Sequence, residues 1–388
     1  MSRIVFLTCH LTGTGHLVRT LALARAAARS GHEVRVITGG RSLSHLDTSG
    51  LEMVQLPPLV VRGLEFSVLR EPNGELVSEA YMAERLRVLA GELSAHPPDA
   101  LITELFPLGR RAMAEEFLAA IAAARTVNPD VAVISSVRDI PEPKPKRLTE
   151  AAARLLKHYD AVLVHGDESF LPLATTWPLP DDIEPMIHHV GYVGGGQVFA
   201  DTAHNQTVLV SVGGGVLGRR LLGVAAKAAA QSSRPWHLLV GGADARTTAQ
   251  DLRAEHPAEN LTIEPARPDY RQLLAGAACS ISLCGYNTAV ELAACTTPAI
   301  LVPSEEADEA EQLIRARRLA EFPGFVLMRG DTLSPGPLAA AAESLALGPP
   351  RSMVPIQSDD GSLAVRTVED VIRAKLGESV TMPSTSTG

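Results

Sequence analysis

The segment Ser282–Glu291 combines residue types that can bind phosphate and sugar hydroxyls. With its flanks it predicts a buried strand, a tight turn and a helix, in the order 279–283, 285–288 and 289–295. Such a path directs backbone N–H groups and the positive end of a helix dipole at one place. Thr288 adds a hydroxyl donor, and the Glu291 carboxylate could accept from two ribose hydroxyls. The segment therefore predicts an anion site, unless Gly285 only ends a strand and Glu291 is a solvated helix residue.

A second glycine-containing turn, Cys9–His16, follows the first predicted strand, 3–8. The helix after it ends at Gly31, and the next strand is predicted over 32–38. The turn fails the dinucleotide fingerprint, because Val18 stands where the third glycine belongs and no acidic residue ends the second strand. A dehydrogenase is therefore disfavoured. His16, at the helix start, is the best candidate for a general base, although a histidine that caps or lines the loop is the alternative.

The first half alternates predicted strands and helices, which indicates a parallel sheet with helices on both faces. The further strands are 52–56, 100–103, 131–135 and 161–164, and the helices between them are 79–93, 110–125 and 148–158. Ligands of such sheets bind beyond the carboxyl ends of the strands. Polar residues lie at those ends: His10, Glu104, Arg138, Asp139, His165 and Asp167. Either Asp139 or Glu104 could orient His16, and the sequence does not choose between them.

The β/α alternation starts again after the glycine-rich segment 191–196, which predicts two Rossmann-like domains joined by a linker. The predicted strands are 207–212, 237–240, 260–264, 279–283 and 298–302. The helices are 217–230, 270–275, 289–295 and 309–319, and an amphipathic helix follows over 362–376.

Composition excludes several classes of protein. The chain has 388 residues, 46% hydrophobic and 20% charged, which is ordinary globular composition with room for two cores. A formal net charge of −9 disfavours a nucleic-acid binder. The cysteines have no paired metal-ligand spacing and predict buried free thiols: Cys9, Cys279, Cys284 and Cys295. No stretch reaches transmembrane length or resembles a signal peptide, so we expect a cytoplasmic protein.

The chain resembles the GT-B glycosyltransferases, specifically their MurG-like (family 28) branch, and a group of predicted bacterial glycosyltransferases close to it. The resemblance rests on Gly285-x-x-Thr288-x-x-Glu291 before the apolar strand that ends at Pro303, on the glycine turn that ends at His16, and on the run 309–318. It covers about residues 3–345 and is more specific in the second half. It implies the GT-B fold, in which two Rossmann-like domains face each other across a cleft where the reaction occurs.

The resemblance also assigns roles to single residues. Around the donor it implies that Gly213, Gly214 and Gly215 form the turn that binds the diphosphate and that Pro265 and Ala266 bracket the nucleobase. It implies a phosphate-binding helix start at Gly285, Tyr286, Asn287 and Thr288, and a ribose-binding acid at Glu291. The pair Glu311 and Gln312 would bind hydroxyls of the donor sugar. On the acceptor side it implies a loop before the base, with the polar strand ends beside it: Thr14, Gly15, His10, Arg138 and His165. One departure is the loop 304–308, which is more acidic than expected beside a diphosphate.

These observations give an expected domain plan. An acceptor-side Rossmann-like domain spans 1–192, and a linker spans 193–206. The nucleotide-sugar-binding domain spans 207–348. A C-terminal segment with a helix that crosses back to the first domain spans 349–377, and a disordered tail spans 378–388.

We expect an inverting, metal-independent hexosyltransferase with no cofactor. The helix start at 285–288 would stabilise the diphosphate leaving group, and no Asp-x-Asp pair stands at a strand end to hold a metal. We expect the donor to be a nucleotide-diphosphate sugar, and specifically a UDP-linked one. The acceptor is unidentified and could be a small molecule, a natural product or a lipid-linked group. The alternatives are a nucleotide-sugar hydrolase or 2-epimerase on the same fold and, from another class, a non-catalytic nucleotide-binding protein.

Overall fold

The computed structural model describes residues 1–11, 15–42, 46–63, 65–140, 145–194, 205–213, 216–242, 244–304 and 310–378. The chain divides into two compact units, which we call unit 1 (Met1–Gly194 and Gln357–Gly388) and unit 2 (Gly195–Ile356). Each has its own parallel sheet and apolar core. The Rossmann-like α/β architecture predicted for both halves is confirmed.

The described part of unit 1 contains a seven-stranded parallel sheet in the order β3-β2-β1-β4-β5-β6-β7. Its strands are β1 (Arg3–Thr8), β2 (Glu33–Thr38), β3 (Glu52–Gln55), β4 (Ala100–Glu104), β5 (Ala132–Arg138), β6 (Ala161–His165) and β7 (Ile187–His189). Its helices are α1 (Gly15–Arg29), α2 (Glu79–Ala95), α3 (Ala114–Val127), α4 (Pro145–His158) and α11 (Ser362–Lys375).

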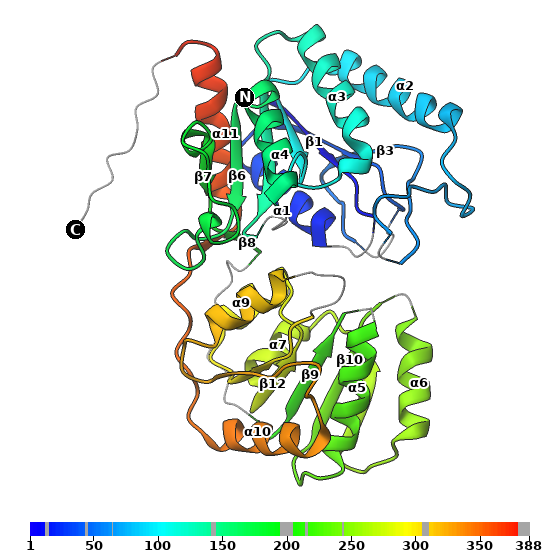
Figure 1. Ribbon diagram of the computed structural model, residues 1–388, viewed down its shortest axis with the longest axis vertical. Helices are drawn as coiled ribbons and strands as arrows, with labels where there is room; N and C mark the ends of the chain where they lie inside the picture. Colours follow the sequence, from blue (N-terminus) through cyan, green and yellow to red (C-terminus); the bar gives the residue numbers. More distant parts are fainter. Residues whose placement is uncertain are drawn as a thin grey trace, which may run out of the picture. The chain divides into compact units, whose positions relative to one another are not determined.

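The side chains of β1 alternate between the two faces of this sheet, so unit 1 has two apolar layers. Val5 and Leu7 pack with residues of α2, α3 and α4. Ile4 and Phe6 pack with residues of α1 and α11 (Figure 1). The helix predicted near the end of the chain therefore forms part of the core of unit 1, through Val365, Val368 and Ile372.

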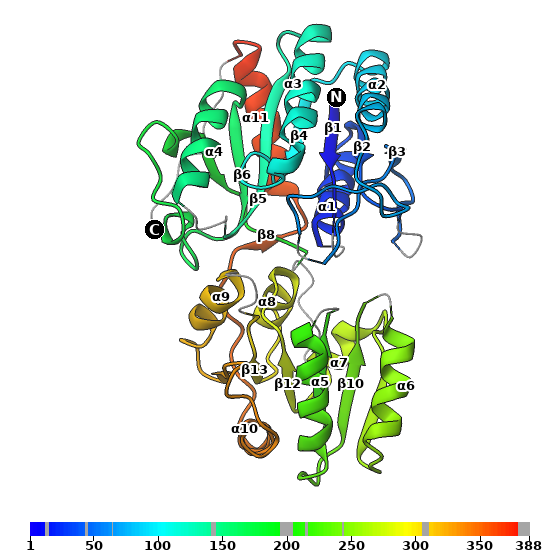
Figure 2. The same ribbon diagram turned by 45° about the vertical axis from the view of Figure 1, so that its right-hand side comes forward.

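The described part of unit 2 contains a six-stranded parallel sheet in the order β11-β10-β9-β12-β13-β14. Its strands are β9 (Val208–Val212), β10 (Trp236–Val240), β11 (Leu261–Pro265), β12 (Cys279–Ser282), β13 (Ala299–Leu301) and β14 (Phe325–Leu327). Its helices are α5 (Val216–Ala229), α6 (Ala245–Glu255), α7 (Tyr270–Gly276), α8 (Tyr286–Ala293), α9 (Glu311–Leu319) and α10 (Pro335–Leu347). Helix α8 begins beyond the carboxyl end of β12 (Figure 2).

In each sheet the chain reverses its direction of strand addition once. The reversal falls between β1 and β4 in unit 1, and between β9 and β12 in unit 2. Such switch points leave a crevice at the carboxyl ends of the strands, where open α/β sheets bind their ligands. The predicted functional residues therefore have to be located at these two points.

Several predicted element boundaries were wrong. Residues 286–288, expected in a turn, form the first turn of α8, which ends at Ala293. The helix predicted over 110–125 begins at Ala114, after a 3₁₀ turn over Arg111–Met113. The helix predicted over 148–158 begins earlier, at Pro145, because the fixed φ of proline suits a first helical turn.

The boundary between the units also differs in detail from the predicted plan. Val193, the first residue of the predicted linker, lies buried in the short strand β8 (Tyr192–Val193), which pairs with β15 (Ser358–Asp359). Residues 349–356, assigned to the returning segment, group with unit 2. The predicted acidic loop at 305–308, most of the linker and the tail from 379 onward lie outside the described residues.

Candidate functional site

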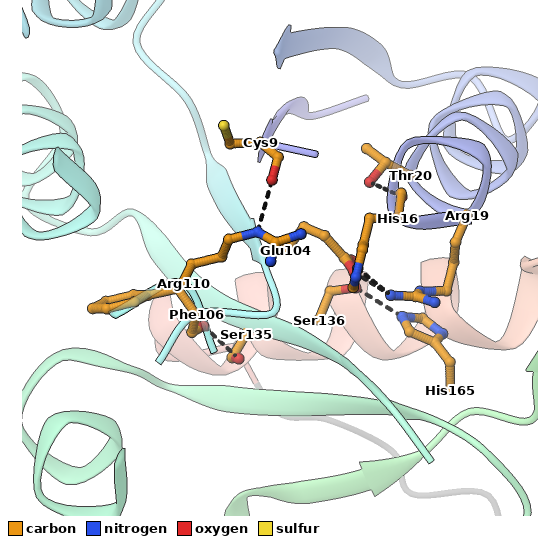
Figure 3. A network of polar contacts seen from close by, with 10 residues as sticks. All are labelled: Cys9, His16, Arg19, Thr20, Glu104, Phe106, Arg110, Ser135, Ser136 and His165. Atoms are coloured by element: carbon orange, nitrogen blue, oxygen red, sulfur yellow. Dashed lines mark hydrogen bonds and ion pairs between the residues drawn. The ribbon is translucent and has the colours of Figure 1, made fainter. Parts of the chain in front are cut away.

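His16 and Glu104 meet at the switch point of unit 1. His16 is the second residue of α1, and its Nδ1 lies 2.9 Å from Oε1 of Glu104, the last residue of β4. Glu104 is buried, whereas 14% of the His16 side chain is exposed. Of the two acids considered from sequence, Glu104 is the one that contacts His16 (Figure 3). Asp139 instead accepts a hydrogen bond from the Tyr192 hydroxyl at 3.2 Å.

The contacts of Glu104 determine which His16 nitrogen carries the proton. An ionised carboxylate only accepts hydrogen bonds, so Nδ1–H donates to Glu104 and Nε2 presents its lone pair. Arg19, one helical turn after His16, also donates to Oε1 of Glu104 and lies 3.4 Å from Nδ1. Among the described residues, none forms a hydrogen bond with Nε2 of His16. The geometry suits a base that accepts a proton at Nε2.

The network continues into the sheet through the second oxygen of Glu104. The Ser136 hydroxyl donates to Oε2 of Glu104 at 2.9 Å and lies 2.9 Å from Nε2 of His165. Since the single hydroxyl proton of Ser136 goes to the carboxylate, His165 donates its Nε2–H to Ser136. Strand register explains the meeting, because Glu104 pairs with Ser136 and Arg138 pairs with His165 across adjacent parallel strands.

Electrostatics keep the His16 imidazole neutral. Burial lowers the pKa of His16 well below its ordinary value; Glu104 opposes this, and the charges of Arg138 and Arg110 lower it further. For Glu104, burial raises the pKa, but the Arg19 charge and the hydrogen bond from His16 lower it more, so it stays ionised. The pair at physiological pH is therefore a neutral imidazole held by a carboxylate.

The remaining acceptor-side candidates lie around this pair. Gly15 begins α1, and Thr14 lies outside the described residues. His10 is buried, and a Cβ atom on Gly40 would approach within 2.6 Å of its ring, so Gly40 permits this packing. Burial lowers the pKa of His10, and burial followed by Arg19 lowers the pKa of His165.

Sequence reasoning missed three members of this site: Arg19, Ser136 and Arg110. Arg19 lies three residues after His16, a spacing that places both side chains on one helix face and could have indicated it. Ser136 could have been found by extending the fifth predicted strand by one residue. Arg110 had no usable signal, because its position depends on a left-handed backbone conformation in the loop after β4 (φ 57°).

In unit 2, glycines shape the turn after β9. Gly213 follows the strand, and no described atom lies within 4 Å of a Cβ built on it. Packing does require glycine at positions 241 and 218. A Cβ on Gly241 would lie 2.7 Å from the carbonyl oxygen of Val212, and a Cβ on Gly218 would lie 2.7 Å from that of Gly213. Gly218 completes a phosphate-type pattern, Gly213-x-Gly-x-x-Gly218, of which the sequence prediction used only the first three residues. Gly214 and Gly215 lie outside the described residues.

The start of α8 presents amides at the switch point of unit 2. Ala289 N–H donates to the carbonyl of Gly285 at 2.9 Å, so the amides of Asn287 and Thr288 precede the first intrahelical bond. A Cβ on Gly285 would have no described atom within 4 Å, although its φ of −64° is open to any residue. Packing therefore does not require glycine here, whereas close approach of a ligand would. Tyr286 is buried and anchors the helix start.

Glu291 lies one turn further along α8. Its carboxylate accepts from Arg271 Nε at 3.1 Å, and 15% of its side chain is exposed. Burial raises the pKa of Glu291, and Arg271 opposes this. Arg271 thus holds the carboxylate that was predicted to bind ribose.

Gln312 connects two loops at the same edge of the sheet. Its Oε1 accepts from the backbone amides of Cys284 and Ser304, each at 3.1 Å. The side-chain oxygen of Gln312 is therefore used by the protein, so the predicted contact to a donor sugar would have to come from its NH₂ group. Glu311, its partner in the prediction, is the first residue of α9.

The two residues predicted to bracket a nucleobase lie at the end of β11, where Pro265 is the last strand residue and Ala266 follows it. Ala266 N–H donates to the carbonyl of Val240 at 2.8 Å, and Pro265 has no N–H. Any backbone contact from this pair to a base would therefore use a carbonyl oxygen as acceptor, which matches the N3–H of uracil or thymine.

Neither a metal-binding cluster nor a membrane-spanning helix occurs among the described residues. No group of three or more His, Cys, Asp or Glu side chains in the described ranges is placed to hold a metal ion. No helix in the same ranges is both long and apolar enough to cross a bilayer. All four cysteine thiols are free and buried.

Comparisons with known proteins agree with the fold. Residues 14–169 match the glycosyl transferase 4-like domain, and residues 207–363 match the glycosyltransferase family 28 C-terminal domain. The comparison with curated proteins returns no match.

Solved glycosyltransferases share the fold over nearly the whole chain. MurG of Acinetobacter baumannii is 18% identical with a TM-score of 0.57, covering 98% of this chain and 96% of that one. Glycosyltransferase VinC in complex with dTDP is 14% identical with a TM-score of 0.59, covering 96% and 95%. UGT2 of Phytolacca americana, complexed with UDP-2-fluoroglucose and pterostilbene, is 17% identical with a TM-score of 0.58, covering 96% and 94%.

The two domain matches and the shared fold define the class: the chain is a GT-B glycosyltransferase. Within that class it is of the family 28-like type, as its second unit indicates. The predicted recognition, fold class and enzyme class are thus confirmed, and the non-catalytic alternative falls away.

Proposed function

We propose that the protein transfers a hexosyl group from a UDP-sugar to an acceptor hydroxyl, with inversion at the anomeric carbon and without a metal ion. The observation that carries the proposal is the neutral His16 imidazole, fixed at Nδ1 by Glu104 and open at Nε2 toward the switch point of unit 1. Nε2 takes the proton of the acceptor hydroxyl as its oxygen attacks the anomeric carbon. The bond from that carbon to the diphosphate oxygen breaks, and the diphosphate leaves with the electron pair.

Residues of unit 2 would stabilise the leaving group. The amides of Asn287 and Thr288, the Thr288 hydroxyl and the positive end of the α8 dipole stabilise the charge that develops on the diphosphate. These groups take the electrostatic role that a divalent cation has in metal-dependent transferases. Gly213 and Gly285 allow the phosphates to approach the backbone.

Two groups of atoms in unit 2 favour a donor that carries a uridine nucleotide. Carbonyl oxygens at Pro265 and Ala266 suit the N3–H of uracil, and the Glu291 carboxylate suits a ribose with both hydroxyls. Two of the structural neighbours were solved with pyrimidine nucleotides, dTDP in VinC and UDP-2-fluoroglucose in UGT2. We place the enzyme in the cytoplasm, where nucleotide sugars are made.

A thermal-shift panel of nucleoside diphosphates and nucleotide sugars in excess EDTA tests the proposal. UDP and UDP-sugars should raise the Tm most, and turnover of the best donor with an acceptor library should proceed in EDTA. NMR of the product should show the inverted anomer. Loss of activity that Mg²⁺ or Mn²⁺ restores contradicts the metal-free mechanism, and rapid turnover with water alone favours the hydrolase.

A further inference from the structure

We propose that the acceptor carries an anionic group, a carboxylate or a phosphate, and that the guanidinium of Arg110 binds it beside His16. The inference rests on the proposed function, because it names the class of molecule whose hydroxyl His16 deprotonates. Figure 3 shows Arg110 reaching from the loop after β4 toward the Glu104 and His16 side chains.

The first support is that Arg110 has a single neutral partner. Its Nε donates to the carbonyl of Cys9 at 2.7 Å, which directs the guanidinium toward the carboxyl end of β1. Among the described residues no carboxylate forms an ion pair with it. The guanidinium remains charged at any physiological pH, although burial lowers its pKa. A part-buried cation without a counter-charge is unfavourable, and an anionic ligand would relieve that cost.

The second support is that the nearest anion is already engaged. Oε1 of Glu104 accepts from Arg19 and His16, and Oε2 accepts from Ser136. The Cys9 thiol supplies no charge either, because burial raises its pKa to about 12. Glu104 therefore forms its ion pair with Arg19, and although its charge also acts on Arg110, it forms no ion pair with that guanidinium.

The third support is the sign of the whole cluster. Three guanidinium groups act on the buried pair: Arg19 on Glu104, and Arg110 and Arg138 on His16. The described carboxylates of this cluster are Glu104 and Asp139, so its described part holds three guanidinium groups and two carboxylates. This excess favours an anionic acceptor over a neutral one.

The backbone of Arg110 gives a further indication. Its φ of 57° lies in the left-handed region, which a long L side chain rarely adopts. The Met113 N–H donates to the Arg110 carbonyl at 2.9 Å, and the Nε bond to Cys9 fixes the other end. The chain thus accepts an unfavourable backbone conformation that places this guanidinium at the site.

Histidine-selective ¹⁵N NMR of the full chain tests the proposal through the His16 ring nitrogens. The probes are benzoate and phenyl phosphate, with benzamide as the neutral counterpart, all at one ionic strength. We expect saturable His16 shifts with at least one anion and none with benzamide, and the tighter anion identifies the acceptor group as carboxylate or phosphate. Equal shifts from benzamide, or no shift from either anion, overturn the proposal.

Variants separate Arg110 from a general charge effect. Arg110→Gln should weaken the anion at least tenfold, and Arg110→Lys should lie between it and the unmodified protein because it keeps the charge but loses the paired N–H donors. Arg25→Gln, on α1 and paired with Asp47, is the matched control and should bind normally. The unfolding midpoint of Arg110→Gln shows whether this variant is folded. If the folded variant binds the anion as tightly as the unmodified protein does, the proposal is wrong. UDP affinity, measured separately, should be unchanged in every variant, so failure of the donor proposal is detected independently.

Discussion

The two units hold their candidate sites by opposite means. In unit 1 the site consists of side chains that fix one another: His16, Glu104, Arg19 and Ser136 form a continuous buried network. In unit 2 the site consists largely of backbone: no described atom lies within 4 Å of a Cβ built on Gly213 or Gly285, and helix amides precede the first hydrogen bond of α8.

The difference matches the chemistry assigned to each. A general base needs one tautomer and one protonation state, which neighbouring charges provide. A diphosphate needs many weak donors and room to approach, which amides and glycines provide. Substitutions should therefore act on turnover in unit 1 and on donor affinity in unit 2.

The largest effect should come from His16→Ala. It removes the base and should lower kcat by roughly 10²–10⁴-fold while UDP affinity changes little. Steady-state kinetics with isothermal titration of UDP measure both. Near-normal turnover would remove His16 from the mechanism.

Two carboxylate variants test which acid orients His16. Glu104→Gln keeps the size of the side chain but removes the charge that holds Nδ1–H, so kcat should fall. Asp139→Asn is the control, because Asp139 accepts from Tyr192. An equal fall in both variants would contradict the assignment of Glu104 as the partner of His16.

Next in size is the ribose preference. UDP should bind more tightly than dUDP, and UDP-sugars more tightly than their dTDP counterparts, by about 1–3 kcal/mol, since a deoxyribose lacks one hydroxyl for Glu291. Glu291→Ala should remove most of that preference, whereas the exposed Glu321→Ala, on the same unit, should leave it intact. Equal affinity of the unmodified protein for UDP and dUDP would show that Glu291 does not contact the ribose.

A smaller effect separates two glycines of unit 2. Gly285→Ala should change the free energy of unfolding by less than about 0.5 kcal/mol, because its Cβ meets no described atom within 4 Å, yet weaken UDP by about three- to tenfold. Gly241→Ala should instead destabilise the fold by about 1–3 kcal/mol, since its Cβ would lie 2.7 Å from the Val212 carbonyl. Urea unfolding and UDP titration would distinguish them; equal unfolding effects would mean that Gly285 is structural.

The smallest effect concerns pH. A base acts when neutral, and the His16 pKa lies below its ordinary 6.5, so the acid limb of kcat/KM should fall below pH 6.5. Arg110→Gln removes a charge that lowers this pKa, so its limb should move to higher pH. Tryptophan fluorescence at each pH checks that the protein stays folded. An acid limb at or above pH 6.5 that Arg110→Gln leaves in place would contradict the electrostatic description.

Local patterns predicted some of these features because they are local in the chain. Strand β1 and the start of α2 lie where alternation and apolar spacing placed them, and His16 follows from a glycine turn at a helix start. The missed features depend on distant residues. Ser136 matters because β5 lies in register beside Glu104, and Arg110 matters because a loop takes a left-handed turn. Neither the register of β5 against β4 nor the left-handed turn at Arg110 can be predicted from the neighbouring residues alone.

Strand order also explains why the acid could not be chosen. Glu104 and Asp139 both end strands with similar sequence surroundings, yet only β4 adjoins β1, which leads into the helix that carries His16. The sequence supplied both candidates, and the sheet topology separates them.

Helix α11 has a consequence for how the protein is made. Its residues Val365, Val368 and Ile372 cover the face of the unit 1 sheet that carries Ile4 and Phe6, yet the ribosome adds them after all of unit 2. During synthesis unit 2 can fold as soon as its own strands emerge, while the earlier-made sheet has only α1 on this apolar face and still lacks α11. The first unit to be translated is thus the last to be completed, and chaperones that bind nascent chains would find their target there.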